Sequence, residues 1–225
     1  MTVEIWSDVM CPFCYLGKRN FEAAVKQFTG KEKVEIEWKS FQLNPALGTE
    51  GMSTLEYLSQ MRGMQEEQVR ASFEGIRLAG AEKGLIFNFD KTVVTNTAAA
   101  HRLIQLAKEK GKGDEAEELL FKAHFTDGLN VSDPQVLAAT GRELGLSAAE
   151  TESAQADPRY QEGLDKDLYE ARQIGVRGVP FFVFDRKYAV SGAQPAEAFL
   201  LTLERLEAET ESPEGNSCTV DGNCN

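Results

Sequence analysis

Two cysteines near the N-terminus are spaced for sulfur chemistry. Cys11 and Cys14 lie in the stretch SDVMCPFCYLG, one helical turn apart if a helix begins there. A thiolate is the nucleophile of disulfide exchange, and a second sulfur within one turn can close a disulfide or attack a mixed one. The spacing therefore predicts a dithiol in which Cys11 attacks or releases a partner's sulfur and Cys14 resolves the mixed disulfide.

The flanking pattern predicts a strand that leads into a helix at this point. Residues 2–6, TVEIW, alternate apolar and polar side chains, and from Pro12 apolar residues recur at helical spacing as far as Phe28. A sulfur at this junction faces the unpaired N–H groups and the positive end of the helix dipole, which favour a thiolate. Because Phe13 carries no charge, we expect a less oxidising couple than a histidine between the cysteines would give.

A second strand and a later hairpin extend the pattern. Residues 34–43 alternate as a strand does, and residues 53 to about 174 contain several helical patterns but no convincing strand. Residues 181–184 then form a short apolar run, followed by a tight turn, a second strand at 188–191 and an amphipathic helix. The predicted fold class is α/β, with a β-α-β … β-β-α layout interrupted by a large all-helical insertion.

These patterns divide the chain into four parts. The parts are residues 1–44 (first part of the α/β domain), 45–174 (helical insertion domain), 175–208 (second part of the α/β domain) and 209–225 (a flexible C-terminal tail that contains cysteines). The tail has no apolar periodicity and is rich in Glu, Ser, Gly and Asn, which is typical of a segment without a packed core.

A proline opens the strand at 181–184. Pro180 follows Gly178 and Val179, and the X-Pro bond is the one peptide bond in which the cis form is cheap, about 0.5–1 kcal/mol above trans. Packed opposite the cysteines, a cis bond would leave the Val179 backbone free to pair with an extended substrate segment. An ordinary strand-opening proline, which donates nothing to the sheet ladder, is the alternative.

The tail holds the other two cysteines, Cys218 and Cys224, in the stretch SCTVDGNC. One hypothesis is an electron shuttle that exchanges with Cys11 and Cys14; a surface disulfide or idle thiols are the alternatives. A zinc site made of all four cysteines is less favoured, because five intervening residues exceed the two to four usual in a zinc knuckle. We therefore predict no metal.

Composition excludes several partner classes. The formal net charge is -12 and no Lys/Arg-rich run occurs, which argues against nucleic acid or an anionic membrane surface as a partner. No apolar run approaches the roughly 20 residues that span a bilayer. The N-terminal residues lack the basic and apolar regions of a secretory signal, so we expect a cytoplasmic protein, in which paired cysteines are more often catalytic or metal-binding than structural.

Other conspicuous side chains are expected to be structural. His101 and His124 sit within helical patterns without a neighbouring triad or metal-ligand arrangement, and we expect buried imidazoles with satisfied hydrogen bonds. Trp6 and Trp38 are expected in the core.

The motifs at both ends resemble the DsbA-like thioredoxin-fold family, and specifically its cytoplasmic FrnE-type branch. They are SDVMCPFCYLGKR and QIGVRGVPFFVFDRKYAVSGAQP, and the resemblance covers roughly residues 1–208, with NTAAAHRLIQLA and FTDGLNVSDP in the insertion also similar. It implies a thioredoxin-like fold with a helical insertion, and dithiol–disulfide exchange on protein substrates that carry thiols or disulfides. It also implies catalytic Cys11 and Cys14 and a cis Pro180, with Pro12, Phe13 and Val179 beside them at the substrate.

Two alternatives remain at this stage. A related branch, similar to 2-hydroxychromene-2-carboxylate isomerases and kappa-class glutathione transferases, has a serine where this chain has Cys11, which favours the oxidoreductase. Glutathione could still serve as electron donor, and no other cofactor is expected. The second alternative is a redox-sensitive, chaperone-like binding module that uses apolar side chains such as Phe13, Val179, Met61 and Met64, although methionines at helical spacing are usually core.

Overall fold

The computed structural model describes residues 1–211 and places a four-stranded sheet, in the order β2-β1-β5-β6, among helices. The strands are β1 (Thr2–Ser7), β2 (Glu35–Ser40), β5 (Phe181–Phe184) and β6 (Tyr188–Ser191). β1 and β2 are parallel and are joined by helix α1 (Pro12–Gln27), whereas β5 runs antiparallel to both β1 and β6. The chain thus has the β-α-β … β-β-α layout expected from its sequence, ending in α9 (Ala196–Glu211).

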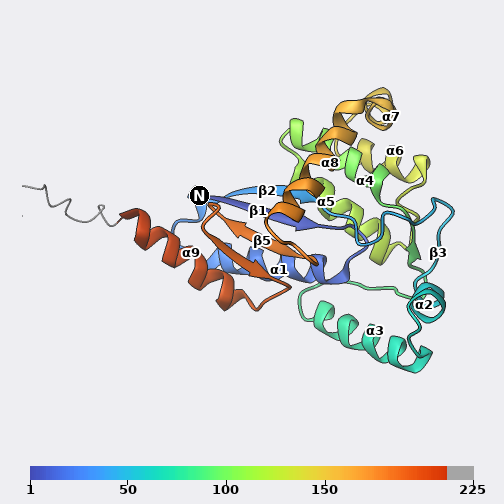
Figure 1. Cartoon of the computed structure of the whole chain (residues 1–225), viewed down its shortest axis with the longest axis horizontal. Coiled ribbons are helices and arrows are strands. Elements are labelled where there is room, and N and C mark those ends of the chain that lie inside the picture. Colours follow the sequence, from blue (N-terminus) through green and yellow to red (C-terminus); the bar gives the residue numbers. More distant parts are fainter. Residues whose placement is uncertain (212–225) are drawn as a thin grey trace, which may run out of the picture.

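Helices α1 and α9 supply the apolar side chains that cover one face of this sheet (Figure 1). Phe21 on α1 lies 5.6 Å from the ring centroid of Phe182 on β5 and 5.7 Å from that of Phe199 on α9. Trp38 belongs to the same cluster and is buried, as expected. β1 is central and buried on both faces, so its position is fixed firmly, and with it the position of the residues that follow its last residue, Ser7.

Helix α8 (Pro158–Gln173), which closes the insertion, contributes to the opposite face. Trp6 of β1 packs there with Ala171 and Val183, and its indole N–H donates a hydrogen bond to the carbonyl of Asp167 at 3.0 Å. Trp6 is fully buried, so both tryptophans are core residues. The insertion is therefore packed directly against the sheet whose strand β1 leads into the cysteines.

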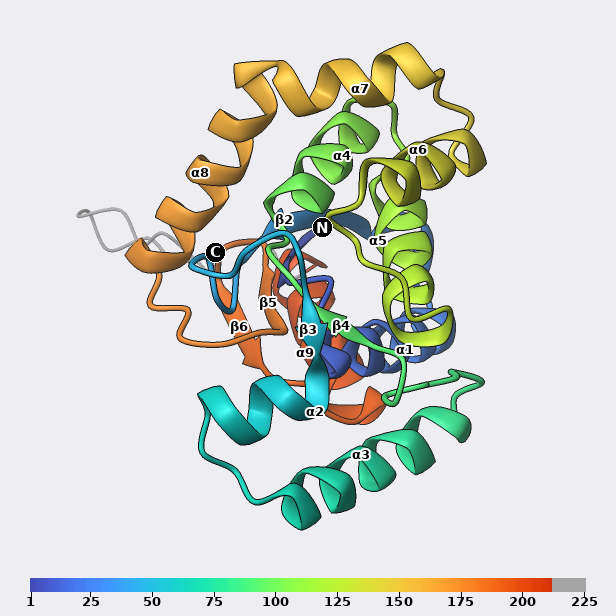
Figure 2. The same cartoon turned by 90° about the vertical axis from the view of Figure 1, so that its right-hand side faces the viewer.

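The insertion forms two groups of helices, which Figure 2 shows on either side of a short β ladder. Their bounds are α2 (Thr54–Glu56), the π-helical turn η2 (Tyr57–Met61), α3 (Glu66–Ala81), α4 (Ala98–Glu109), α5 (Gly113–Phe121), the π-helical turn η3 (Lys122–Thr126), α6 (Pro134–Glu143) and α7 (Ala148–Ala156). A further 3-10 turn, η1 (Lys31–Lys33), precedes β2. Helices α4 to α8 share one apolar core, while α2 and α3 lie apart from them (Figure 2).

Two details differ from the sequence expectation of an all-helical insertion. Strands β3 (Met52–Ser53) and β4 (Val93–Val94) pair antiparallel and tie the two ends of the α2–α3 segment together. A two-residue ladder leaves no alternation to detect, because its pairing depends on the surrounding tertiary structure. Helix α7 was also not predicted, because its sequence AAETESAQA has no apolar stripe. The one sequence signal for this helix is the capping box formed by Ser147 and Glu150.

Candidate active site

Cys11 and Cys14 lie where β1 gives way to α1. Cys11 is the N-cap residue of α1 with extended backbone angles, and Pro12 occupies the first turn. Both cysteines are free thiols, and they approach each other to 3.4 Å. Cys11 is 4% exposed and Cys14 1%, so neither is freely accessible, and Cys11 is the less buried of the two. A disulfide between them requires only a small closure of this distance.

The backbone just before β5 faces Cys11. The Cys11 thiol donates a hydrogen bond to the carbonyl oxygen of Val179, with an Sγ–O distance of 3.5 Å. The Val179–Pro180 peptide bond is cis, as the resemblance implied. Gly17 on α1 permits this approach, because a Cβ atom at that position would lie 2.9 Å from Cγ of Pro180. A segment about 170 residues away in sequence therefore completes the surroundings of the reactive sulfur.

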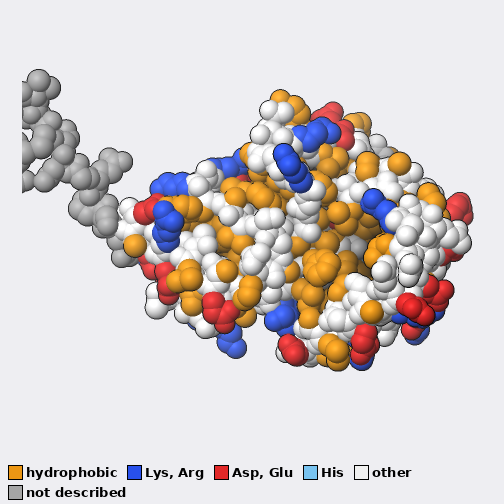
Figure 3. All heavy atoms as spheres, turned by 60° about the horizontal axis from the view of Figure 1, so that its bottom comes forward, with side chains coloured by type: hydrophobic (Ala, Val, Ile, Leu, Met, Phe, Trp, Pro, Cys, Tyr) orange, Lys and Arg blue, Asp and Glu red, His pale blue; other side chains and the backbone are white. Residues whose placement is uncertain are grey.

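An apolar cavity of about 390 Å³ opens beside Cys11. It is lined by Cys11, Pro12, Phe13 and Val179 and by side chains of the insertion, among them Leu58, Phe73, Ile76, Phe89, Val94 and Phe125. Figure 3 shows hydrophobic side chains gathered in a hollow on one face of the molecule. Pockets that bind small molecules or side chains are mostly apolar and have volumes of roughly 300–1,000 Å³.

Apolar side chains continue from the cavity to the surface. Phe13 is 49% exposed, and Met61 and Met64 are 64% and 37% exposed. The methionines are therefore not core residues, which corrects the usual reading of methionines at helical spacing. Met61 is the last residue of the π-helical turn η2, and Met64 lies in the loop between η2 and α3.

The environment behind Cys14 is polar and fully buried. Ser7 and Asp8 at the end of β1 meet His101 of α4 and Glu117 of α5, and all four are inaccessible to solvent. The Ser7 hydroxyl donates to Oε2 of Glu117 at 3.4 Å, and Nε2 of His101 lies 3.6 Å from Oδ1 of Asp8. Asp8 also accepts a hydrogen bond from the Leu43 backbone N–H at 2.7 Å, which holds the loop after β2 against the site.

Burial shifts the pKa values of the ionisable groups in and around this site. Burial, reinforced by the neighbouring Cys11 sulfur, raises the pKa of Cys14 well above its ordinary value. Burial likewise raises the pKa of Glu117 to about 7. For His101 burial lowers the pKa, but the Asp8 carboxylate and Glu117 outweigh it and raise the pKa overall. Cys14 is thus kept as a thiol at neutral pH, which suits a residue that acts after Cys11.

The histidines depart from the sequence expectation. Both lie in helical segments and are buried, but neither nitrogen of His101 and not Nδ1 of His124 has a hydrogen-bond partner among residues 1–211. His124 lies against the ring of Phe125 and lines the apolar cavity, where burial lowers its pKa to about 4. His101 instead belongs to the buried polar cluster behind Cys14.

Ion pairs join the helix that carries the cysteines to the insertion. Lys18 on α1 is buried and lies 3.1 Å from Asp114 and 3.3 Å from Glu118 of α5. Arg19 also pairs with Glu118, and the Tyr15 hydroxyl donates to the same carboxylate at 2.7 Å. Because the insertion contacts α1 through these charges, displacement of α5 would move the first turns of α1 as well.

Sequence reasoning missed Asp8, Gly17 and Glu117. Glu117 left one signal: it shares a helix face with Leu120 and Phe121, three and four residues on, and an acid on an apolar face is unusual. Cys218 and Cys224 lie outside the residues that the structure describes. No group of three or more His, Cys, Asp or Glu side chains suited to a metal ion occurs within residues 1–211.

The sequence of the chain matches a known family model. Residues 2–204 fit the DSBA-like thioredoxin domain, which is most of the chain. The chain belongs to the DSBA-like thioredoxin domain family. The α/β layout with an inserted helical segment between β2 and β5 is the fold of this family, and members of it are thiol–disulfide oxidoreductases.

Individual relatives of this DsbA-like protein agree with that membership. A crystal structure of the probable DsbA oxidoreductase SCO1869 from Streptomyces coelicolor has 37% identity and a TM-score of 0.90, with 99% of this chain and 97% of that chain covered. The uncharacterized protein YwbO of Bacillus subtilis is 30% identical over 184 residues, 80% of this chain and 85% of its own. The cytosolic disulfide reductase DsbM of Pseudomonas aeruginosa shares the fold at 19% identity and a TM-score of 0.62, covering 92% and 100%.

Within residues 1–211, no helix is both long enough and apolar enough to cross a membrane.

Proposed function

We propose that this DsbA-like protein is a protein thiol–disulfide oxidoreductase that exchanges disulfides through Cys11 and Cys14. The observation that carries the proposal is the pair of free thiols 3.4 Å apart at the start of α1, one bordering a cavity and the other buried behind it. The presence of both sulfurs favours this activity over a glutathione-dependent isomerase or transferase, whose branch was expected to carry a serine at position 11.

The proposed reduction proceeds in two exchanges. The Cys11 thiolate attacks one sulfur of a substrate disulfide, the substrate's S–S bond breaks, and its other sulfur leaves as a thiolate that takes up a proton. Cys14 then loses its proton and attacks Sγ of Cys11, so that the mixed disulfide breaks and the Cys11–Cys14 disulfide forms. Two electrons pass from the dithiol to the substrate, and an isomerase would use the same first step in both directions.

The residues around Cys11 would hold the substrate. Pro12, Phe13 and Val179 line the cavity next to the sulfur, and Pro180 packs behind Val179 against α1. A substrate segment could bind the Val179 backbone in place of the Cys11 thiol. Its own sulfur would then lie beside Cys11. The partners are therefore proteins that carry disulfides or thiols, bound through apolar contacts.

We also propose the FrnE-type branch and a cytoplasmic location. The support is the sequence resemblance and the shared fold with DsbM, which is itself a cytosolic disulfide reductase and has also been solved with GSH. A cytosolic glutathione pool keeps most moderate couples reduced, so the direction we propose is reduction or isomerisation, with glutathione returning the electrons.

The tail cysteines remain a separate proposal. Cys218 and Cys224 would pass electrons between solution thiols and the Cys11–Cys14 disulfide. The double variant Cys218→Ser/Cys224→Ser is expected to turn over disulfides more slowly at a fixed glutathione concentration. Equal rates for the parent and the double variant would remove the shuttle and leave the main proposal intact.

Cys11→Ser tests the main proposal and separates it from a second function. The apolar cavity and the exposed Phe13 and Met61 also suit a binding module for unfolded chains. An oxidoreductase loses insulin reduction and the reactivation of scrambled ribonuclease when Cys11 is replaced. A binding module retains its suppression of aggregation in the same variant, and unchanged insulin reduction in Cys11→Ser would overturn the oxidoreductase.

A further inference from the structure

The cavity beside Cys11 is nearly uncharged. Among residues 1–211 its lining contains a single charged side chain, Arg62, which follows η2. The cavity's histidine, His124, is buried with its pKa lowered to about 4 and is neutral at physiological pH. An apolar cavity of about 150 Å³ binds benzene, so 390 Å³ accommodates about two groups of that size.

Arg62 is held in place without being neutralised. Its guanidinium carbon lies 5.6 Å from the centroid of the Tyr57 ring, and its Nε donates to the Tyr57 hydroxyl at 3.2 Å. Tyr57 is buried, and its hydroxyl also accepts from Nδ2 of Asn44 at 3.0 Å, which fixes the ring. Within the described chain Arg62 has no ion pair, and its one hydrogen bond is the one from Nε to Tyr57, so its two terminal nitrogens have no acceptor.

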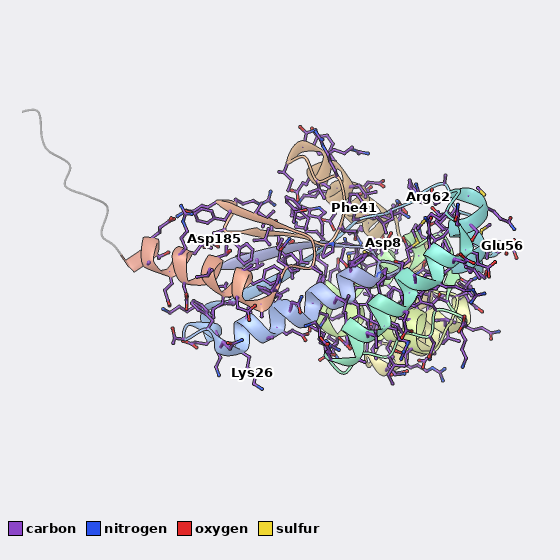
Figure 4. The ribbon with its side chains drawn as sticks, turned by 90° about the horizontal axis from the view of Figure 1, so that it is seen from below. Asp8, Lys26, Phe41, Glu56, Arg62 and Asp185 are labelled. Carbon is purple, nitrogen blue, oxygen red and sulfur yellow. The ribbon has the colours of Figure 1, made fainter. Side chains whose placement is uncertain are left out.

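A guanidinium in this state is ready to bind a carboxylate. Arginine presents two parallel N–H groups that match a carboxylate, and the planar group loses little freedom when its position is already set by a stacked ring. Figure 4 shows Arg62 in the same half of the molecule as Asp8, which follows β1, and far from the α9 end. Arg62 and Cys11 border one cavity, so a ligand that spans it can reach both.

The apolar surface extends beyond the cavity. Phe13 and Met64 line the cavity but are 49% and 37% exposed, so a ligand confined to 390 Å³ would leave part of each side chain in water. A polypeptide is long enough to cover them, because each extended residue adds about 3.3 Å. Methionine adapts its shape to different apolar partners, which suits a site for varied chains.

We propose that the cavity selects extended polypeptide segments in which the reacting cysteine has a large apolar side chain and a carboxylate within two residues. The apolar side chain fills the cavity against Phe73 and Phe125, and the carboxylate pairs with Arg62. Arg62 is thus a specificity-determining residue contributed by the insertion. The inference rests on the proposed function, since it defines which disulfides reach Cys11.

Short peptides test this directly. Each carries one cysteine in a disulfide with 2-thiopyridine, a leaving group without a carboxylate, and its neighbours are Phe-Glu, Phe-Gln, Phe-Lys or Ala-Glu. Release of 2-thiopyridone in a single turnover of the reduced protein gives the second-order rate constant, which stands for kcat/KM in this comparison. The parent protein is expected to prefer Phe-Glu over Phe-Gln by about two- to fivefold, because Arg62 is exposed and an exposed ion pair is weakened by solvent. It is expected to prefer Phe-Glu over Ala-Glu by about tenfold, the size of one buried apolar side chain.

Variants assign the preference to the residue. Arg62→Gln is expected to process the Phe-Glu and Phe-Gln peptides equally, and Arg62→Glu to prefer Phe-Lys. Arg70→Glu is the matched control: it makes the same charge change on α3 at an exposed arginine that pairs with Glu66 and does not line the cavity. It is expected to keep the parent's preference for Glu.

The results that would overturn this inference differ from the result that would overturn the proposed function. The inference would be overturned if the parent processed Phe-Glu and Phe-Gln with equal kcat/KM, or if Arg62→Gln kept the parent's preference. In either case a reaction that depends on Cys11 would still uphold the proposed function. If 3-phenylpropionate competed as strongly as the Phe-Glu peptide, the occupant of the cavity would be a small carboxylate. That result would overturn the proposal that the cavity binds a polypeptide. Turnover that survives in Cys11→Ser would instead remove the proposed function itself.

Discussion

The Cys11 side of the dithiol is open and apolar, whereas the Cys14 side is closed and polar. On the first side the α2–α3 segment of the insertion supplies phenylalanines, one methionine and one arginine. On the second side helices α4 and α5 of the same insertion supply His101 and Glu117, which no solvent reaches. Two sulfurs 3.4 Å apart thus have very different surroundings.

This difference assigns the two sulfurs different tasks. A substrate can approach Cys11 through the cavity, while burial raises the pKa of Cys14 and holds it as a thiol until Cys11 has reacted. It also shows that the insertion is part of the site rather than a cover over it. The α2–α3 segment and η3 line the cavity beside Cys11, and α4 and α5 supply the buried polar side chains behind Cys14.

The largest effect is expected from removing the resolving sulfur. In Cys14→Ser, Cys11 still attacks substrate, but the mixed disulfide must wait for a thiol from solution. Intramolecular groups act at effective concentrations far above those of cellular thiols, so turnover should fall by about 100-fold or more. Acid trapping and mass spectrometry should find substrate bound to Cys11. Turnover at the parent rate without a trapped adduct would show that the two cysteines do not have separate tasks.

A smaller effect is expected where α1 meets the loop before β5. Gly17→Ala places a Cβ 2.9 Å from Cγ of Pro180, so either the loop or α1 must shift. Such overpacking costs about 1–3 kcal/mol of unfolding free energy, and moving Val179 away from Cys11 should lower kcat/KM by about tenfold. Urea unfolding and insulin reduction measure the two quantities.

Gly75→Ala is the control for that change. Gly75 is an exposed residue of α3 with no atom within 4 Å of a built Cβ, so alanine there should stabilise the helix by about 0.5–1 kcal/mol and leave activity unchanged. If both alanine variants behaved alike, close contact between α1 and Pro180 would have no role in the site.

The smallest effect on turnover, but a clear one on stability, is expected from Glu117→Gln. The pKa of Glu117 is about 7 in the folded protein against an ordinary value of 4.5, so the folded state binds more protons than the unfolded state between these pH values. The stability that this carboxyl supports is complete below pH 4.5 and is lost as the pH rises to about 7. Glutamine does not titrate and avoids this loss.

The variant should therefore gain stability relative to the parent as the pH rises. Between pH 4.5 and 8 the variant's unfolding free energy should rise relative to the parent's by about 3 kcal/mol at most. The charged or titratable groups that act on Glu117 are Asp8, Asp114, His101 and Lys18. Urea unfolding of both proteins at several pH values measures it. A constant difference between them at every pH would mean that Glu117 titrates as an ordinary exposed acid.

Local features were predictable from the sequence, and features that depend on distant contacts were not. The strand-to-helix junction at Cys11 and the strands at 181–184 and 188–191 follow from short-range patterns. The turn at Asp185–Arg186 was also predicted; both residues have positive φ angles, 45° and 56°, and the Lys187 N–H closes the turn on the Phe184 carbonyl at 2.9 Å.

The buried polar cluster behind Cys14 is an example of a feature that the sequence did not predict. Glu117 reaches Ser7 across 110 positions in sequence, and nothing local to either residue indicates the contact. The apolar cavity was anticipated in part, since Phe13, Val179 and Met64 line it, but its walls on α3 and η3 were not, because only the tertiary structure brings them to Cys11. The expectation that His101 has satisfied hydrogen bonds failed because its neighbours, an aspartate and a glutamate, were not known.

The exchange between Cys11 and Cys14 is tested most directly by a redox titration. The full-length protein is equilibrated in buffers of graded reduced and oxidised glutathione, quenched in acid, alkylated and mapped by peptide mass spectrometry. The account predicts that Cys11 and Cys14 lose their alkylation together along a single two-electron curve, as one disulfide joined to no glutathione. Two thiols that stay alkylated at every ratio, or a Cys11 that forms only a glutathione adduct, would contradict it.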